Sequence, residues 1–88
     1  MNRKEISEYL EERGETAVLA DGLDDAFMGF SQRMNEPLLA VYSLKKVIEI
    51  LMERDGMSYE DAIEYADFNI LGAWVGPQTP IFVYPMEF

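Results

Sequence analysis

The chain has 88 residues, of which 49% are hydrophobic, and its 17 acidic residues outnumber 7 basic ones to give a formal net charge of −10. A chain of this length buries only about two-thirds of the surface that it exposes when unfolded, so we expect one domain over residues 1–88, of modest stability. The absence of Cys and His excludes disulfides, thiolate zinc sites and the commonest general base.

The negative charge repels nucleic acid and anionic membranes and attracts basic protein surfaces. We therefore expect no direct nucleic-acid binding and no membrane partner, although an acidic balance can also serve solubility alone. The N-terminal residues lack the apolar stretch of a signal peptide, and no apolar run reaches the ~18 residues of a membrane span. These features favour a cytoplasmic protein.

A first helix is predicted over residues 2–13, because Ile6, Tyr9 and Leu10 recur at helical spacing and Gly14 suits its end. Residues 16–25 are ambiguous. Their first half fits either a short strand or an extended arm, and the Asp-Gly pair at 21–22 indicates a turn.

Two strands are predicted next, over residues 26–32 and 37–42, as an antiparallel hairpin with residues 33–36 in its turn. Alternation along the first strand places Phe27 and Gly29 on one face, and Met28 and Phe30 on the other. Gly29 indicates a bulge or a close backbone approach.

The clearest pattern is a helix over residues 44–54, with Ser43 as its N-cap and Asp55-Gly56 at its end. Its apolar side comprises Leu44, Val47, Ile48, Leu51 and Met52. A second helix is predicted over residues 59–71, since Ser58 and Asp61 match a capping box. Its inner side comprises Tyr59, Ala62, Ile63, Ala66 and Ile70, widened by Tyr65, Phe68 and Leu71 so that cover on more than one side is expected. Gly76-Pro77 ends this segment, and residues 79–84 form the last predicted strand.

This order of elements predicts an α+β fold. We expect a small, antiparallel-dominated sheet of about three strands covered by the two-helix unit, plus the N-terminal helix. The last strand should join the sheet beside one strand of the hairpin.

The segment DGMSYEDAIEYADFNILGAWVGPQTPIFV at residues 55–83 resembles a family of small, mostly uncharacterised proteins found in bacteria and their phages, as do DGLDDAFMGF and PLLAVYSLKKVIEILMERDG upstream. The resemblance covers residues 20–84 and carries no established activity. Ala66 stands where a bulky aromatic residue is more usual in that family. The resemblance implies a phage-derived protein that acts in the host cytoplasm, with a host or defence protein as its partner.

Acidic residues line the outer sides of the two central helices. Glu60, Glu64 and Asp67 share one side of the second helix, and Glu49 and Glu53 form a similar pair on the first. Carboxylates one or two helical turns apart are about 5–11 Å apart, which approximates the spacing of phosphates in nucleic acid. The pattern is compatible with a binding surface, with a DNA mimic or inhibitor as one form, but a solvated helix face is the commoner cause of such a pattern.

The aromatic residues of this region receive two interpretations. Tyr59, Tyr65 and Phe68 are expected in the core, whereas Trp74 follows the helix end and is expected at the surface as an apolar anchor for a partner. The C-terminal residues 84–88 are apolar for a terminus, so they are expected to pack on the domain or on a neighbour.

No chemistry beyond binding is indicated. Asp21, Asp24 and Asp25 are a candidate Mg²⁺ or Ca²⁺ site, but their spacing matches no EF-hand loop and favours roles in turns and caps. Phosphate-binding, dinucleotide-binding and nucleophile-elbow motifs do not occur in the sequence. We therefore expect no enzyme activity, no metal and no cofactor.

Three hypotheses follow. The first is a small interaction protein that binds a basic host or defence protein through the helical acidic residues, with Trp74 as anchor. The second is a homo-oligomer with a structural or ligand-sequestering role, built through the C-terminal strand and tail. The third is a metal-dependent enzyme that uses the three aspartates.

Overall fold

The computed structural model describes residues 2–86, and these form helices and a three-stranded mixed sheet, which confirms the predicted α+β class. The main elements are α1 (Arg3–Arg13), β1 (Phe27–Ser31), β2 (Leu39–Ser43), α2 (Leu44–Asp55), α3 (Tyr59–Ala66) and β3 (Ile81–Val83). A short 3-10 helix, η1 (Asp24–Ala26), precedes β1. A π-helical segment, η2 (Asp67–Leu71), continues α3, so the helix predicted over residues 59–71 spans α3 and η2.

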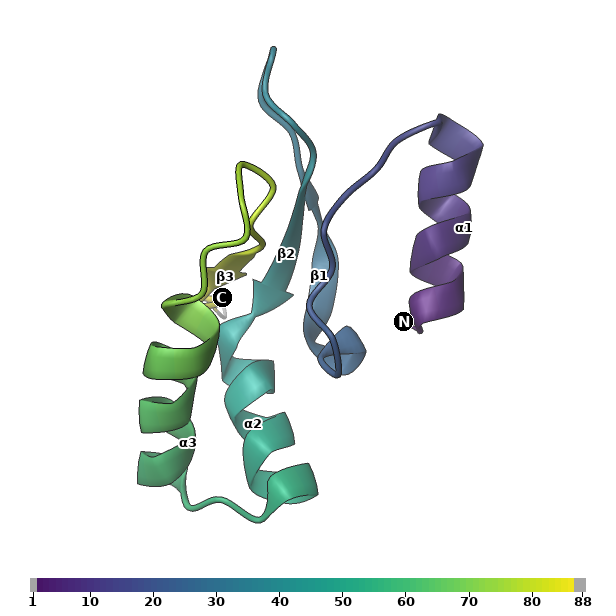
Figure 1. Ribbon diagram of the computed structural model, residues 1–88. Coiled ribbons are helices and arrows are strands. Elements are labelled where there is room, and N and C mark those ends of the chain that lie inside the picture. Colours follow the sequence, from purple (N-terminus) through teal and green to yellow (C-terminus); the bar gives the residue numbers. More distant parts are fainter. Residues whose placement is uncertain (1, 87–88) are drawn as a thin grey trace.

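The central strand of the sheet is β2, with β1 and β3 at the edges. β1 and β2 pair antiparallel, whereas β3 pairs parallel to β2 after the chain has passed through α2 and α3. In Figure 1, α2 and α3 lie side by side beyond the end of β2, and α1 stands on the other side of the molecule, nearest β1. The last strand thus joins one strand of the hairpin, as predicted.

A bulge between Phe27 and Gly29 interrupts the register of β1 with β2. Gly29 has a φ of 148°, which residues with a side chain rarely adopt, so the bulge depends on this glycine. The ring centroids of Phe27 and Phe30 are 5.1 Å apart. The predicted alternation, which placed these two rings on opposite faces, is therefore wrong, because the bulge adds a residue between them.

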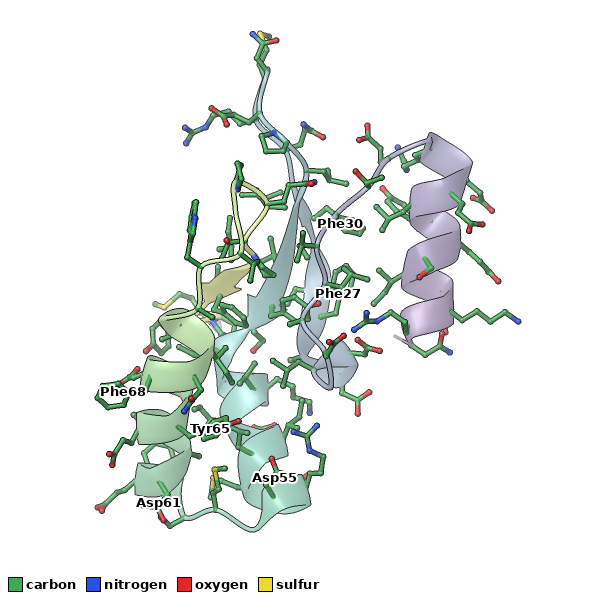
Figure 2. The ribbon with its side chains drawn as sticks, viewed as in Figure 1. Phe27, Phe30, Asp55, Asp61, Tyr65 and Phe68 are labelled. Carbon is green, nitrogen blue, oxygen red and sulfur yellow. The ribbon has the colours of Figure 1, made fainter. Side chains whose placement is uncertain are left out.

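A row of aromatic rings crosses the sheet from this bulge. Tyr9 of α1 stacks on Phe30 with ring centroids 5.5 Å apart. Phe27 meets Tyr42 of β2 edge-on at 5.6 Å, and Tyr42 stacks on Phe82 of β3 at 5.6 Å. Figure 2 shows Phe27 and Phe30 between the sheet and α1. Because each aromatic pair contributes about 0.5–1.5 kcal/mol beyond its buried area, the row helps to hold α1 and both outer strands to β2.

The core lies where β2 leads into the helices. Ala40 and Tyr42 share one face of β2 and are fully buried, as are Val47 of α2 and Ala62 of α3. Small residues at 62 and 66 let α3 pack closely on α2. The complete buried cluster consists of Leu23, Ala26, Ala40, Tyr42, Leu44, Val47, Ile48, Leu51, Ala62 and Ala66.

The predicted caps fix the ends of α2 and α3. The Ser43 hydroxyl accepts a hydrogen bond from the Lys46 N–H at 3.2 Å, and the Ser58 hydroxyl accepts one from the Asp61 N–H at 3.1 Å. Gly56 follows α2 with a φ of 69°, the left-handed conformation that glycine adopts without strain. The helical hairpin therefore begins and turns where the sequence indicated.

The ambiguous residues after α1 form no strand and run as an extended arm over residues 15–20. Side chains from distant elements hold this arm. The Tyr42 hydroxyl accepts a hydrogen bond from the Ala20 N–H at 2.8 Å, Arg3 donates to the Ala20 carbonyl at 2.9 Å, and Gln78 donates to the Thr16 carbonyl at 2.9 Å. The arm is thus ordered without sheet pairing.

Candidate binding site

The α3–η2 helix carries three exposed carboxylates, Glu60, Glu64 and Asp67, here termed the acidic row. Spacings of four and three residues place them about one helical turn apart on one side of the helix. The sequence predicted that these three side chains are exposed to solvent, and the structure confirms it. Its role in binding stays a prediction.

Arg54, the last basic residue in the sequence, is engaged by its own surroundings. Its guanidinium donates to the two Asp55 carboxylate oxygens at 3.0 and 3.1 Å and to the Gly22 carbonyl at 2.6 Å. The hydrogen bonds from Arg54 lower the pKa of the Asp55 carboxyl below its usual value. Arg54 therefore ties the end of α2 to the loop before η1, and the chain from residue 55 onward contributes only negative charge.

A groove of about 440 Å³ runs between α2 and α3. Leu44, Ile48 and Met52, on successive turns of α2, form one wall, and Tyr59 and Ile63 belong to the α3 wall. The volume falls within the ~300–1,000 Å³ that is usual for ligand pockets. The groove is therefore large enough to receive several side chains of a partner.

The segment after β3 closes the sheet end of this groove. Ser43 pairs with Val83 in the parallel register of β2 and β3, so the residues that follow them, Leu44 and Tyr84, leave the sheet side by side. Tyr84 and Pro85 accordingly line the groove together with Leu44. The lining residues thus come from three separate parts of the chain.

The acidic row borders the groove. Successive residues of a helix are turned by about 100° around its axis. Going around the axis of α3 from the buried Ala66, the next of these side chains is Ile63 of the groove wall, and the three carboxylates come after it. Asp67 belongs to both features, because it lines the groove and is part of the row. An apolar hollow and a line of negative charge therefore lie next to each other on one side of α3.

The prediction that Tyr59, Tyr65 and Phe68 form part of the core is wrong. Their exposed fractions are 61%, 42% and 76%, whereas the buried residues of α3 are Ala62 and Ala66. Figure 2 shows Phe68 on the side of α3 that points away from α2. The helix is apolar on several sides, but within residues 2–86 it is covered chiefly on the side facing α2.

The other residues proposed from the sequence lie in different places. Glu49 lines the groove, and its carboxylate pairs with Lys46 at 3.3 Å. Glu53 lines a separate hollow with Asp24 and Asp25. Trp74 is 75% exposed, as expected, but it lies in the loop after η2 and is not among the groove-lining residues.

The groove was not predicted from the sequence, because its walls have the pattern of core residues. Leu44, Ile48 and Ile63 were expected to face only the core, and Tyr84 was expected to end the last strand and begin the apolar tail, whereas β3 ends at Val83. One pattern in the sequence could have indicated the groove. Leu44, Ile48 and Met52 recur every four residues on one helix and Ile63 lies on the next, so each helix has more apolar surface than its contact with the other helix can cover. Of the tail residues 84–88, the last two, Glu87 and Phe88, lie outside the described part of the chain.

Two of the three aspartates near η1, Asp21 and Asp24, pair with Arg3 of α1. The Asp24 carboxylate accepts hydrogen bonds from Arg3 Nε at 3.2 Å and Nη2 at 3.0 Å, and Asp21 lies 3.6 Å from Arg3 Nη1. The hydrogen bond to Asp24 raises the pKa of Arg3. Over residues 2–86, no group of three or more acidic side chains is placed to hold a metal ion.

Comparison with family models, with curated proteins and with solved structures gives no match. No helix within residues 2–86 combines the length and the apolar character needed to cross a membrane.

Proposed function

We propose that the protein is a small, non-catalytic interaction protein that binds a basic surface of another protein through the α3 side of the molecule. The observation that carries the proposal is the acidic row beside the apolar α2–α3 groove. Interfaces need apolar area for affinity, and complementary charge for orientation and fast encounter. This side of α3 offers both.

The charge distribution supports a basic partner. The net charge is −10, and no Lys or Arg occurs after Arg54. A field of this kind speeds the approach of a positively charged surface and weakens as the Debye length falls from ~10 Å at 0.1 M salt to ~3 Å at 1 M. Fast, salt-sensitive association is therefore expected.

The sequence resemblance supports a particular kind of partner. If the protein is phage-derived, a host or defence protein in the host cytoplasm is the proposed target. Inhibition would follow where the acidic row occupies a surface that otherwise binds nucleic acid.

The test uses two variants that change the net charge equally. Glu60, Glu64 and Asp67 are changed together to Lys in one, and the exposed α1 residues Glu5, Glu8 and Glu12 are changed together to Lys in the other. Partners captured from a host lysate by the wild type are purified, and association rates are measured at several salt concentrations.

The α3 variant should associate much more slowly than the wild type, and the α1 variant should differ little. Both should stay folded, because exposed substitutions usually change stability by less than about 0.5 kcal/mol. Equal association rates for the wild type and the α3 variant would refute the acidic-row mechanism. An equal fall in both variants would show that only net charge matters.

A second candidate function is self-association, which the exposed apolar residues around the end of α3 favour. Phe68, Leu71, Trp74 and Val75 are all exposed, and contiguous apolar surface often marks an interface. The edge strand β3 is a poorer contact, because it is short and flanked by Pro80 and Pro85. A monomeric mass at high micromolar concentration, measured by light scattering, would exclude this candidate.

A further inference from the structure

We propose that the α2–α3 groove binds an amphipathic, basic helix of the partner protein. This inference rests on the function proposed above and specifies the element that is recognised. It follows from the shape of the groove, from the state of the backbone around it and from the charge at its rim.

The groove has dimensions that suit the binding of a helix. Leu44, Ile48 and Met52 occupy successive turns of α2, so the wall extends about 12 Å at ~1.5 Å per residue. Tyr59 and Ile63 face it from α3. Side chains of an incoming helix can enter such a channel between two helices. A length of about two turns suits apolar anchors at positions i, i+4 and i+7.

A helix fits this site better than an extended peptide. The walls are α2 and α3, and beyond the first turn of each helix the backbone N–H groups of these walls are bonded within the helix. An extended peptide would therefore find few backbone partners in the groove, whereas a helix satisfies its own backbone groups. At the closed end, Pro85 has no N–H to offer.

The rim selects for positive charge. Glu49 lies on the α2 side and Asp67 on the α3 side, with Glu60 and Glu64 continuing the acidic row. On the α2 side Lys45 also lines the groove and Lys46 pairs with Glu49, so the excess of negative charge lies on the α3 side, along the acidic row. Lys and Arg beside the apolar anchors would reach these carboxylates through flexible stems. A second copy of this chain is a poor occupant, because its own charge is −10.

The probe is a synthetic Leu/Lys peptide of roughly five helical turns, long enough to be helical, with Leu at i, i+4 and i+7 spacing. The control peptide has the same composition in an order that breaks the apolar face. Two variants are compared with the wild type. Ile63→Gln alters the groove wall, and Phe68→Gln alters an equally apolar, exposed residue on another side of the same helix. Affinities are measured by calorimetry, and the site is mapped by NMR chemical shifts.

The amphipathic peptide should bind the wild type and shift the signals of Ile48, Ile63 and Tyr84. Ile63→Gln should weaken binding about tenfold or more, because the loss of one buried Ile contact exceeds the 1.4 kcal/mol that corresponds to a factor of ten. Phe68→Gln should change it little. If Ile63→Gln does not fold, the shift map on the wild type decides, and shifts confined to other surfaces overturn the inference.

Other outcomes separate this inference from the proposed function. Equal binding of both peptides would overturn the inference that the groove binds a helix. Binding would then depend on charge alone, which is compatible with the proposed function. Equal loss in the two variants, or no binding of the amphipathic peptide at millimolar concentration, would also overturn it. A concentration-dependent mass of the unliganded chain that Ile63→Gln abolishes would identify a second copy as the occupant.

Discussion

Replacing Ile6 by Ala should release α1 from the sheet while the rest of the fold stays intact. Ile6 is fully buried and Leu10 nearly so, yet neither belongs to the cluster around β2, α2 and α3. Burying two such side chains contributes about 3–6 kcal/mol in total, and an Ile-to-Ala change costs about 2–5 kcal/mol. The change therefore removes most of the contribution of these two buried side chains to docking, and the stack of Tyr9 on Phe30 remains as the other apolar contact. A free helix of 11 residues is too short to be stable alone.

Amide hydrogen exchange followed by mass spectrometry tests this expectation. Peptides from α1 should lose protection, while those from β2 and α2 should keep it. A dye that binds exposed apolar surface should report the uncovered rings of Phe27 and Phe30. Glu8→Ala, at an exposed position on the same helix, is the control and should change neither signal. Loss of protection in α2 to the same extent as in α1 would refute the reasoning, because α1 would then belong to the main cooperative unit.

Two further predictions concern single hydroxyl groups. Tyr42→Phe removes the hydrogen bond from the Ala20 N–H and should lower the free energy of unfolding by about 0.5–1.5 kcal/mol in urea at neutral pH. Burial raises the pKa of Tyr42 in the folded protein, so its stabilising contribution is complete below pH ~10 and falls as the pH rises above that value. The Tyr42→Phe variant should therefore lose less of its free energy of unfolding at alkaline pH than the wild type does. Stability curves that run parallel for the two proteins from neutral to alkaline pH would contradict this expectation. Ser58→Ala removes the N-cap of α3 and should cost about 1 kcal/mol, whereas Ser58→Gly should cost only a few tenths; equal losses would show that the cap bond is not the cause.

Local rules in the sequence predicted most of the elements. Ser43, Ser58 and Gly56 act within one helical turn of themselves, so their caps and turns could be recognised without knowledge of the tertiary fold. Gly29 indicated a bulge, but its effect on the orientation of Phe30 depends on how β1 pairs with β2. The direction of β3 relative to β2 is likewise a property of the assembled sheet.

The candidate site was predicted only in part, for a related reason. Periodicity indicates which side chains share a side of a helix, and the acidic row was found in this way. It does not indicate how many neighbouring elements are present to cover the apolar sides. Tyr59 and Phe68 have the pattern of core residues, yet no element within residues 2–86 encloses them. The groove also requires Tyr84 beside Leu44, which follows from the strand register.

Ser43 couples the alignment of β2 in the sheet to the position of α2. It ends β2 opposite Val83 and also caps α2, with no linker between strand and helix. A slip of β2 by one residue would invert its two faces, and the bond between Ser43 and Lys46 would make α2 move with the strand. It would also turn α2 by about 100°, which would bring Lys45 toward the position of Leu44. Short strands alone specify their alignment weakly, but here every wrong alignment also misplaces a helix.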